Sequence, residues 1–164
     1  MKELILILET RPSNRSDYMY VKSTLDYYYG SRSYGITPIY AKSKSQLMDQ
    51  ESRIKKAIKE SKRFPVVILF ADVDNKEEKL NENIAKYCKE NDYDLVWMNL
   101  NIEDVYLGKM VETKSKAKEA FKFQLKKDSI FPTMHNLSEE EPLKHKGTSN
   151  ILKILDKYLT RSNT

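Results

Sequence analysis

A chain of 164 residues and 19.3 kDa has the length of one domain, and we expect a single domain over residues 1–164. Its 40% hydrophobic and 32% charged residues exclude a disordered chain, and its net charge of +5 favours contact with a polyanion without demonstrating it. The single cysteine, Cys88, excludes an internal disulfide and suits a reducing cytoplasm. The apolar run near the N-terminus is too short for a signal peptide or a membrane span, so we expect a cytoplasmic protein that does not contact the membrane.

Four short apolar runs are predicted to be β-strands, at residues 4–8, 36–40, 66–70 and 95–98. The third run is apolar at every position, which is typical of a central strand buried on both faces, whereas Pro38 places the second run at a sheet edge or at the beginning of a strand. The runs are separated by segments of helical periodicity, at residues 17–29, 43–61 and 76–91. This alternation predicts an α/β fold, a three-layer sandwich around a mainly parallel sheet of four or slightly more strands.

A helical C-terminal extension is expected from about residue 110. Its lysine-rich segment is predicted to be a helix with an inward face formed by Ala117, Ala120, Phe121 and Leu125. Six lysines between residues 114 and 127 form the most basic surface of the chain, which suits either a solvated face or contact with phosphate groups. A last helix is expected from Ser149 to residue 158.

Several common catalytic motifs are absent from the sequence. Four glycines in the whole chain leave no GxGxxG and no Walker loop, which argues against a dinucleotide or P-loop nucleotide site. The sequence also has no GxSxG elbow and no cysteine–histidine pair, so it does not indicate a covalent nucleophile. The chemistry of the chain must therefore come from its acidic residues.

Acidic residues mark the ends of the predicted strands. They are, in chain order, Glu9 after the first strand, Asp72 and Asp74 after the third, and Glu103 just past the fourth. The carboxyl ends of parallel strands share one edge of a sheet, where open α/β sheets bind their ligands. Carboxylates crowded there repel one another unless a divalent cation neutralises them, and Mg²⁺ suits an all-oxygen site. We expect the carboxylates of Glu9 and Asp72 to lie close enough to share one cation, with their strands adjacent.

The order of these acidic elements resembles the Toprim domain shared by topoisomerases, primases and OLD-type nucleases. The chain is most similar to the small RloB-like Toprim proteins associated with restriction and phage-defence loci. In that group the first strand runs into a glutamate and a polar turn, followed by an acidic residue and a tyrosine, as LILILETRPSNRSDY does here with Glu9, Asp17 and Tyr18. Their later signature, an asparagine and a proline followed by a glutamate in an aromatic-aliphatic turn, resembles NLNIEDVYL, residues 99–107, with Glu103 at the glutamate.

The resemblance spans residues 4–107 and includes departures from the family pattern. Thr10 stands where the family has a glycine after its glutamate, and Leu100 and Val105 replace the usual proline and tryptophan. We expect the side chain of Thr10 to crowd the backbone turn that places Glu9.

An intact site of this kind implies metal-dependent phosphodiester chemistry on nucleic acid, either DNA or RNA. The resemblance implies that Asp72 and Asp74 bind Mg²⁺ or Mn²⁺, that Glu9 is a further metal ligand or a general acid-base, and that Glu103 completes the cluster.

The resemblance also implies groups around the metal site. Arg11, Arg15 or a lysine near Lys109 is expected to stabilise the pentavalent phosphate. Small nucleases of this kind usually depend on a partner protein for their target, such as an ATPase encoded nearby.

Two other classes of function remain open. A haloacid-type phosphatase and a receiver domain also have an acidic pocket, but both carry acidic pairs after the first strand, where this chain has only Glu9. The other class is a non-catalytic regulatory or interaction protein on a degraded Toprim scaffold. Metal binding distinguishes that class from a nuclease, since a regulator does not need Mg²⁺.

Overall fold

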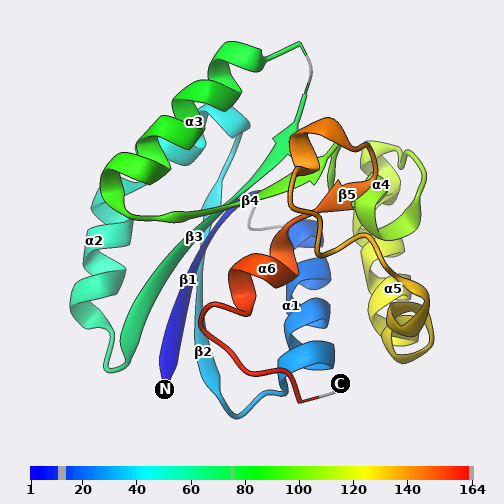
Figure 1. Ribbon diagram of the computed structural model, residues 1–164, viewed down its shortest axis with the longest axis horizontal. Helices are drawn as coiled ribbons and strands as arrows, with labels where there is room; N and C mark the ends of the chain where they lie inside the picture. The colour runs from blue at the N-terminus through cyan, green and yellow to red at the C-terminus, as the bar shows by residue number, and fades with distance from the viewer. Residues whose placement is uncertain (11–13, 75, 163–164) are drawn as a thin grey trace.

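The computed structural model describes residues 1–10, 14–74 and 76–162, and in this part of the chain five strands form one sheet (Figure 1). The strands are β1 (Lys2–Glu9), β2 (Tyr34–Ala41), β3 (Phe64–Val73), β4 (Asp94–Asn99) and β5 (Thr148–Ser149). Their spatial order is β2-β1-β3-β4-β5, with β1 to β4 parallel and β5 antiparallel to β4. The predicted parallel pairing of the first four strands is confirmed, and so are the central place of β3 and the edge position of β2.

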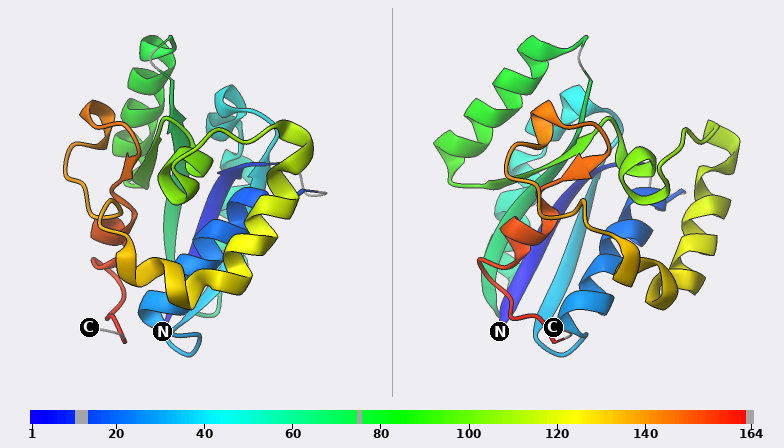
Figure 2. Two further views of the ribbon diagram at one scale, coloured as in Figure 1. Left: turned by 90° about the vertical axis from the view of Figure 1, so that its right-hand side faces the viewer. Right: turned by 45° about the vertical axis from the view of Figure 1, so that its right-hand side comes forward.

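Helices cover both faces of this sheet, which confirms the predicted three-layer sandwich. The α-helices are α1 (Ser16–Tyr29), α2 (Glu51–Glu60), α3 (Glu78–Asn91), α4 (Ile102–Leu107), α5 (Lys116–Ile130) and α6 (Ile151–Leu155). Short 3-10 helices are η1 (Lys44–Asp49), η2 (Thr113–Ser115), η3 (Phe131–Thr133) and η4 (Pro142–Lys144). Figures 1 and 2 show α2 and α3 on one side of the sheet and α1, with α5 beside it, on the other.

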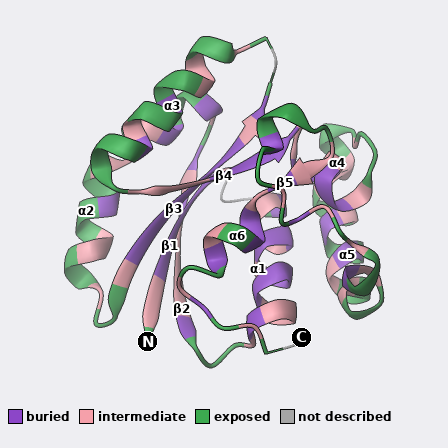
Figure 3. Ribbon diagram, in the orientation of Figure 1, coloured by how far each residue is buried: buried purple, intermediate pink, exposed green. Residues whose placement is uncertain are grey.

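Side-chain alternation along the strands builds a core on each face of the sheet. In β1, Leu4, Leu6 and Leu8 pack with apolar residues of α1, α4, α5 and α6. The intervening Ile5 and Ile7 pack with residues of η1, α2 and α3. All five side chains are fully buried, and the centre of the sheet is buried throughout (Figure 3). A strand that is apolar at every position is therefore explained by burial on both faces.

The inward face of α5 differs from the predicted one. Ala120 and Phe123 are buried, whereas Ala117, Phe121 and Leu125 are exposed to solvent. Apolar residues lie on two faces of this helix, so its periodicity fits more than one orientation. Packing against the rest of the fold selects the face that carries Phe123.

An aromatic cluster holds α5 against α1. The ring centroid of Phe123 lies 5.3 Å from that of Tyr20 on α1, 5.4 Å from that of Tyr106 on α4 and 5.3 Å from that of Phe131 on η3. The hydroxyl oxygens of Tyr106 and Thr24 are 2.6 Å apart and share a hydrogen bond, which joins α4 to α1. These contacts fix the position of α5 against α1 and the sheet.

Two predicted helices have different bounds in the structure. The segment expected to be one helix over residues 43–61 is divided into η1 and α2. The last helix spans Ile151–Leu155 and is shorter than predicted at both ends, because Ser149 belongs to the short strand β5 and the α-helix stops before residue 158. The hydroxyl of Ser149 still accepts the backbone N–H of Ile151 at 3.2 Å, which is close to the capping role expected of it. Within the described residues, every helix is too short or too polar to cross a membrane.

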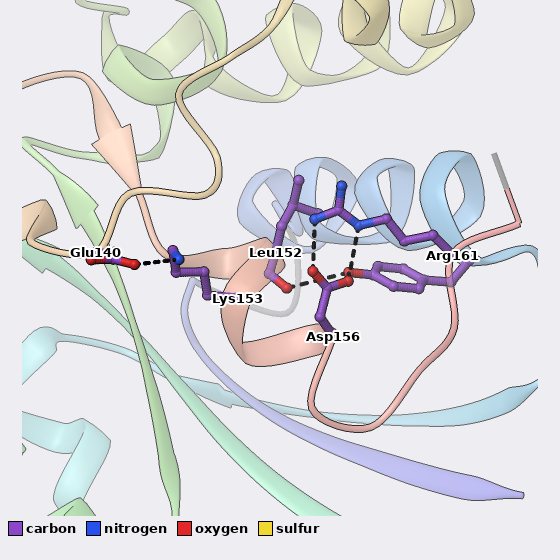
Figure 4. A network of polar contacts seen from close by, with 6 residues as sticks. Glu140, Leu152, Lys153, Asp156 and Arg161 are labelled. Atoms are coloured by element: carbon purple, nitrogen blue, oxygen red, sulfur yellow. Dashed lines mark hydrogen bonds and ion pairs between the residues drawn. The ribbon is translucent and has the colours of Figure 1, made fainter. Parts of the chain in front are cut away.

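A set of polar contacts fastens the end of the described chain to α1 (Figure 4). Arg161 donates to both carboxylate oxygens of Asp156, from Nε at 2.9 Å and from Nη2 at 2.7 Å. The hydroxyl of Tyr29, at the end of α1, donates to the same carboxylate at 2.8 Å. Nearby, Lys153 contacts Glu140 at 2.9 Å. Burial by itself would raise the pKa of Asp156, but the hydrogen bonds from Arg161 and Tyr29 outweigh it and lower the pKa.

This lowered pKa predicts a small pH-dependent contribution to stability. Asp156 stabilises the fold above its unfolded pKa, near 3.9, and the contribution is lost as the pH falls through the lower folded value. Because the side chain is 39% exposed, we expect Asp156→Asn to reduce the free energy of unfolding at pH 7 by no more than about 1 kcal/mol. Thermal melts at pH 7 and below pH 3 measure the effect, with the exposed Asp49→Asn as the control. An equal loss at both pH values would contradict this explanation.

Candidate functional site

The carboxyl ends of β1 and β3 meet near the centre of the sheet, where the chain leaves in opposite directions. From β1 it continues through α1 to β2, and from β3 through α3 to β4 on the other side. Such a topological switch point is where open α/β sheets bind their ligands. Glu9 is the last residue of β1 and Asp72 the penultimate residue of β3. The predicted adjacency of their strands is confirmed.

Side-chain alternation brings Glu9 and Asp72 to this point from opposite faces of the sheet. Glu9 pairs with Ala41 of β2, and Ala41 belongs to the core beneath α2 and α3. Asp72 continues the alternate positions of Ile68 and Phe70, which belong to the core beneath α1. At the open edge of the sheet, both acids nevertheless line the same cavity of ≈ 320 Å³.

On the α1 face, Asp72 is grouped with two acids from helix beginnings. Asp17 lies in the first turn of α1, and Glu103 lies in the first turn of α4. The N-cap residue of α4, Asn101, accepts a backbone N–H of that turn at 3.0 Å, which fixes where this short helix begins. Glu103 is 2% exposed, and Nζ of Lys116, the first residue of α5, lies 3.5 Å from its Oε1.

The acids of this group repel one another. Burial, followed by the charges of Asp17, Glu9 and Glu103, raises the pKa of Asp72 well above its ordinary range. Burial raises the pKa of Asp17 to about 7, and Glu103 is the neighbouring charge that adds most to this increase. The carboxyl group of Asp17 is enclosed, although the residue as a whole is half-buried. Lys116 opposes both changes without reversing them. The group therefore favours uptake of further positive charge, either protons or a cation.

On the opposite face, a buried lysine lies beside Glu9. Lys44, at the beginning of η1, is 6% exposed, and its Nζ contacts Glu77 at 3.2 Å and donates to Asn81. Burial raises the pKa of Glu9, while the charge of Lys44 and a hydrogen bond from its backbone N–H lower it. The net pKa of Glu9 is raised. Its Oε2 is buried and has no hydrogen-bond partner among the described residues.

Asp74 lines the same cavity but is exposed, and it has a local structural role. Its Oδ1 accepts the backbone N–H of Lys76 at 2.9 Å, and its carbonyl oxygen accepts that of Glu77 at 3.0 Å. Asp74 therefore stabilises the turn that leads from β3 towards α3.

The residues expected to contact phosphate have different positions. Arg11 lies outside the described residues, and Arg15 is exposed at the N-cap of α1. Lys109 is exposed and pairs with Glu119 at 3.7 Å, so Lys116 is the lysine that reaches the acidic group. The backbone at Thr10 does not adopt the positive φ that favours glycine, so this position does not require one.

The donor chemistry of the site suits a hard divalent cation, although the geometry is incomplete. Across the described residues, no group of three or more histidine, cysteine, aspartate or glutamate side chains is arranged to hold a metal ion. All available ligands are carboxylate oxygens, as Mg²⁺ prefers, and the buried Oε2 of Glu9 lacks a hydrogen-bond partner among the described residues, whereas Oε1 of Glu103 has only the ion pair with Lys116. The approach of Glu9 and Asp72 from two faces of the sheet keeps these two carboxylates from forming one coordination group, although they interact by charge.

Three residues of the site received no role from the sequence. From the sequence, Asp17 is named only as part of the family resemblance. A signal for it does exist, because an acid in the first turn of the helix that follows the first strand lies at the carboxyl-end edge of the sheet. Lys116 was one of six lysines in its segment, and its position at the beginning of α5 separates it from the others. Lys44 carries no signal in the sequence, since it stands among serines in a polar segment.

The fold and the site together define an α/β protein with a doubly wound sheet and an acidic centre at its switch point. No family model matches the chain, and no match was found among curated proteins or solved structures.

Proposed function

We propose that this protein is a Toprim-type nuclease that uses a divalent cation, Mg²⁺ or Mn²⁺, to cleave phosphodiester bonds of DNA or RNA. The observation that carries the proposal is the group of four acids, Glu9, Asp17, Asp72 and Glu103, which come from four different elements and meet at the switch point, where the charges of the other three raise the pKa of Asp72. Mutual repulsion of this kind opposes folding and is typical of functional sites.

The chain order of the acids supports the Toprim assignment. A glutamate ends β1, the DxD pair of Asp72 and Asp74 lies at the end of β3, and Glu103 follows β4. This is the order on which the resemblance to Toprim proteins rests. The net charge of +5 supports a polyanionic substrate.

Each acid has a role that follows from its surroundings. Asp72, with Asp17 and Glu103 beside it, would hold the cation, which when bound stabilises charge on phosphate oxygens and lowers the pKa of water. Glu9 lines the cavity with an unpartnered oxygen and a raised pKa, which suits exchange of a proton with the attacking water or the leaving oxygen. Lys116 balances part of the negative charge of Glu103.

The biological setting of the proposal rests on the resemblance to RloB-like proteins alone. We propose a role in phage defence or in a mobile element, in the cytoplasm, with a partner protein such as an ATPase that selects the target.

Calorimetric titration with Mg²⁺ or Mn²⁺ tests the metal site directly. We expect the metal-free protein to give a binding heat that is absent from Asp72→Ala and retained by the exposed control Asp49→Ala. A hundredfold excess of metal over Kd should also stabilise the native protein by about 2.7 kcal/mol. Equal heats from the native protein and Asp72→Ala would remove the metal site and, with it, the proposed nuclease.

The runner-up is a regulatory or interaction protein on the same scaffold. Lys44 and Lys116 already contribute positive charge beside the acids, and Asp74 already has a role in its turn. A protein of this class would show neither the heat of metal binding nor cleavage.

A further inference from the structure

The positive charge of this protein is concentrated in one segment. Residues 109–128 contain seven lysines and three acidic residues, a net charge of +4 out of +5 for the whole chain. Most of this segment is α5. The segment is therefore the main source of the field that attracts a polyanion to the protein.

The outer face of α5 combines these lysines with exposed apolar side chains. We define it by its five residues, Lys118, Phe121, Lys122, Leu125 and Lys126, all of which are exposed. The three lysines recur every four residues, which spaces them about 6 Å apart along the helix axis. Phe121 and Leu125 are 53% and 71% exposed, and each lies three residues after one of the lysines, so charged and apolar side chains are neighbours along the face.

No described segment of the chain covers this face. The opposite side of α5, which carries Ala120 and Phe123, packs on the sheet domain, so the α5 outer face points away from it. Among the described residues, Lys122 pairs with Glu119 at 3.4 Å, whereas Lys118 and Lys126 form no ion pair. A face with unbalanced positive charge and apolar side chains is complementary to a polyanion that also offers apolar surfaces.

Helix α5 begins at the acidic site. Lys116, in the first turn of α5, contacts Glu103, and the helix then runs beside α1 away from the carboxyl ends of the strands (Figures 1 and 2). A chain bound along α5 would therefore have one end at the proposed centre.

We propose that the α5 outer face binds a single-stranded segment of nucleic acid and leads it to the acidic site. This inference rests on the proposed function and names its substrate as single-stranded. The lysine spacing suits successive phosphates of an extended strand, and Phe121 offers a ring on which a base stacks, with Leu125 beside it. A duplex hides the faces of its bases, so the apolar residues would have nothing to contact.

Fluorescence anisotropy of a labelled oligothymidylate, with EDTA present, measures this binding without the metal. We expect a duplex of the same length to bind at least tenfold more weakly. The triple variant Lys118→Ala, Lys122→Ala, Lys126→Ala should bind at least tenfold more weakly than the native protein. It should also reduce the slope of log Kd against log salt by about 2, because each phosphate contact to a single strand contributes about 0.7.

The aromatic contribution is tested by a separate variant. Phe121→Ala should weaken binding by about 5- to 100-fold with an unchanged salt slope, because it removes a stacking contact and no charge. The matched control is Lys55→Ala, Lys56→Ala, Lys59→Ala, which removes three exposed charges from α2 on the other side of the sheet and should change Kd by less than threefold.

The inference is overturned if the duplex binds as tightly as the single strand, or if Phe121→Ala binds like the native protein. It is also overturned if Phe121→Ala removes binding to anionic vesicles, or a concentration-dependent dimer, while oligonucleotide binding is unchanged. Its failure is separable from that of the nuclease proposal, because Asp72→Asn should still bind the oligonucleotide in EDTA. Binding along α5 without any metal-dependent cleavage would contradict the nuclease and leave this inference standing.

Discussion

Asp72→Asn is expected to abolish metal-dependent cleavage of nucleic acid while it raises the Tm of the metal-free protein. The substitution keeps the shape of the side chain and removes its charge, so the proposed cation loses a ligand and the acidic group loses a repulsive member. We expect cleavage to fall by at least about 100-fold, the usual scale for losing one electrostatic contact to a transition state. Gel assays with Mg²⁺ and Mn²⁺ measure the loss, with the partner protein added if the purified chain is inactive alone.

The gain in stability has a defined pH dependence. The folded pKa of Asp72 is raised, mainly by burial and then by Asp17, so the native protein loses stability as the pH rises from the unfolded value near 4 through the folded value. Asparagine does not titrate. The Tm difference between the variant and the native protein in EDTA should therefore be small at pH 4 and grow to a few degrees at pH 8. A shift of that size corresponds to a gain of about 1–2 kcal/mol in the free energy of unfolding.

The matched control for this prediction is Asp49→Asn, which makes the same chemical change at an exposed position. It should leave both cleavage and Tm unchanged. A variant at Asp72 that melts lower than the native protein in EDTA and still cleaves would show that this carboxylate is structural. That result would make the catalytic assignment wrong.

The fold could be predicted from the sequence because its strongest signals are long and local. Five consecutive apolar residues in β1 and in β3 require burial on both faces, and the helical segments between strands are long enough for parallel crossovers. The short strand β5 has no such signal, since its two residues pair with β4 through tertiary contacts alone. Its antiparallel direction could not be read from two residues.

The candidate site was predicted only in part, because its geometry depends on strand register. The sequence brings Glu9 and Asp72 to one edge, but the pairing of Ile7 with Leu69 decides that they approach it from opposite faces. A shift of one residue would have placed them on the same face. The contributions of Lys44 and Lys116 come from elements that the sequence does not connect to the strand ends.

The orientation of α5 shows the same limit and leads to the second large effect. Periodicity predicts Phe121 on the inward face of α5, and the structure buries Phe123 there instead. We expect Phe123→Ala to reduce the free energy of unfolding by about 3–5 kcal/mol, because it leaves a cavity among the rings of Tyr20, Tyr106 and Phe131. For a chain of this length that lowers Tm by on the order of 10 °C.

Phe121→Ala is the matched control. It removes the same type of side chain at a position that is two residues before Phe123 and is exposed to solvent. We expect it to change the free energy of unfolding by no more than about 0.5 kcal/mol. If Phe123→Ala does not fold, Phe123→Leu keeps most of the apolar volume and should give a smaller loss that is still measurable by thermal or urea denaturation. Equal losses from Phe121→Ala and Phe123→Ala would mean that both rings are buried, and the α5 outer face would then no longer be available to a nucleic acid.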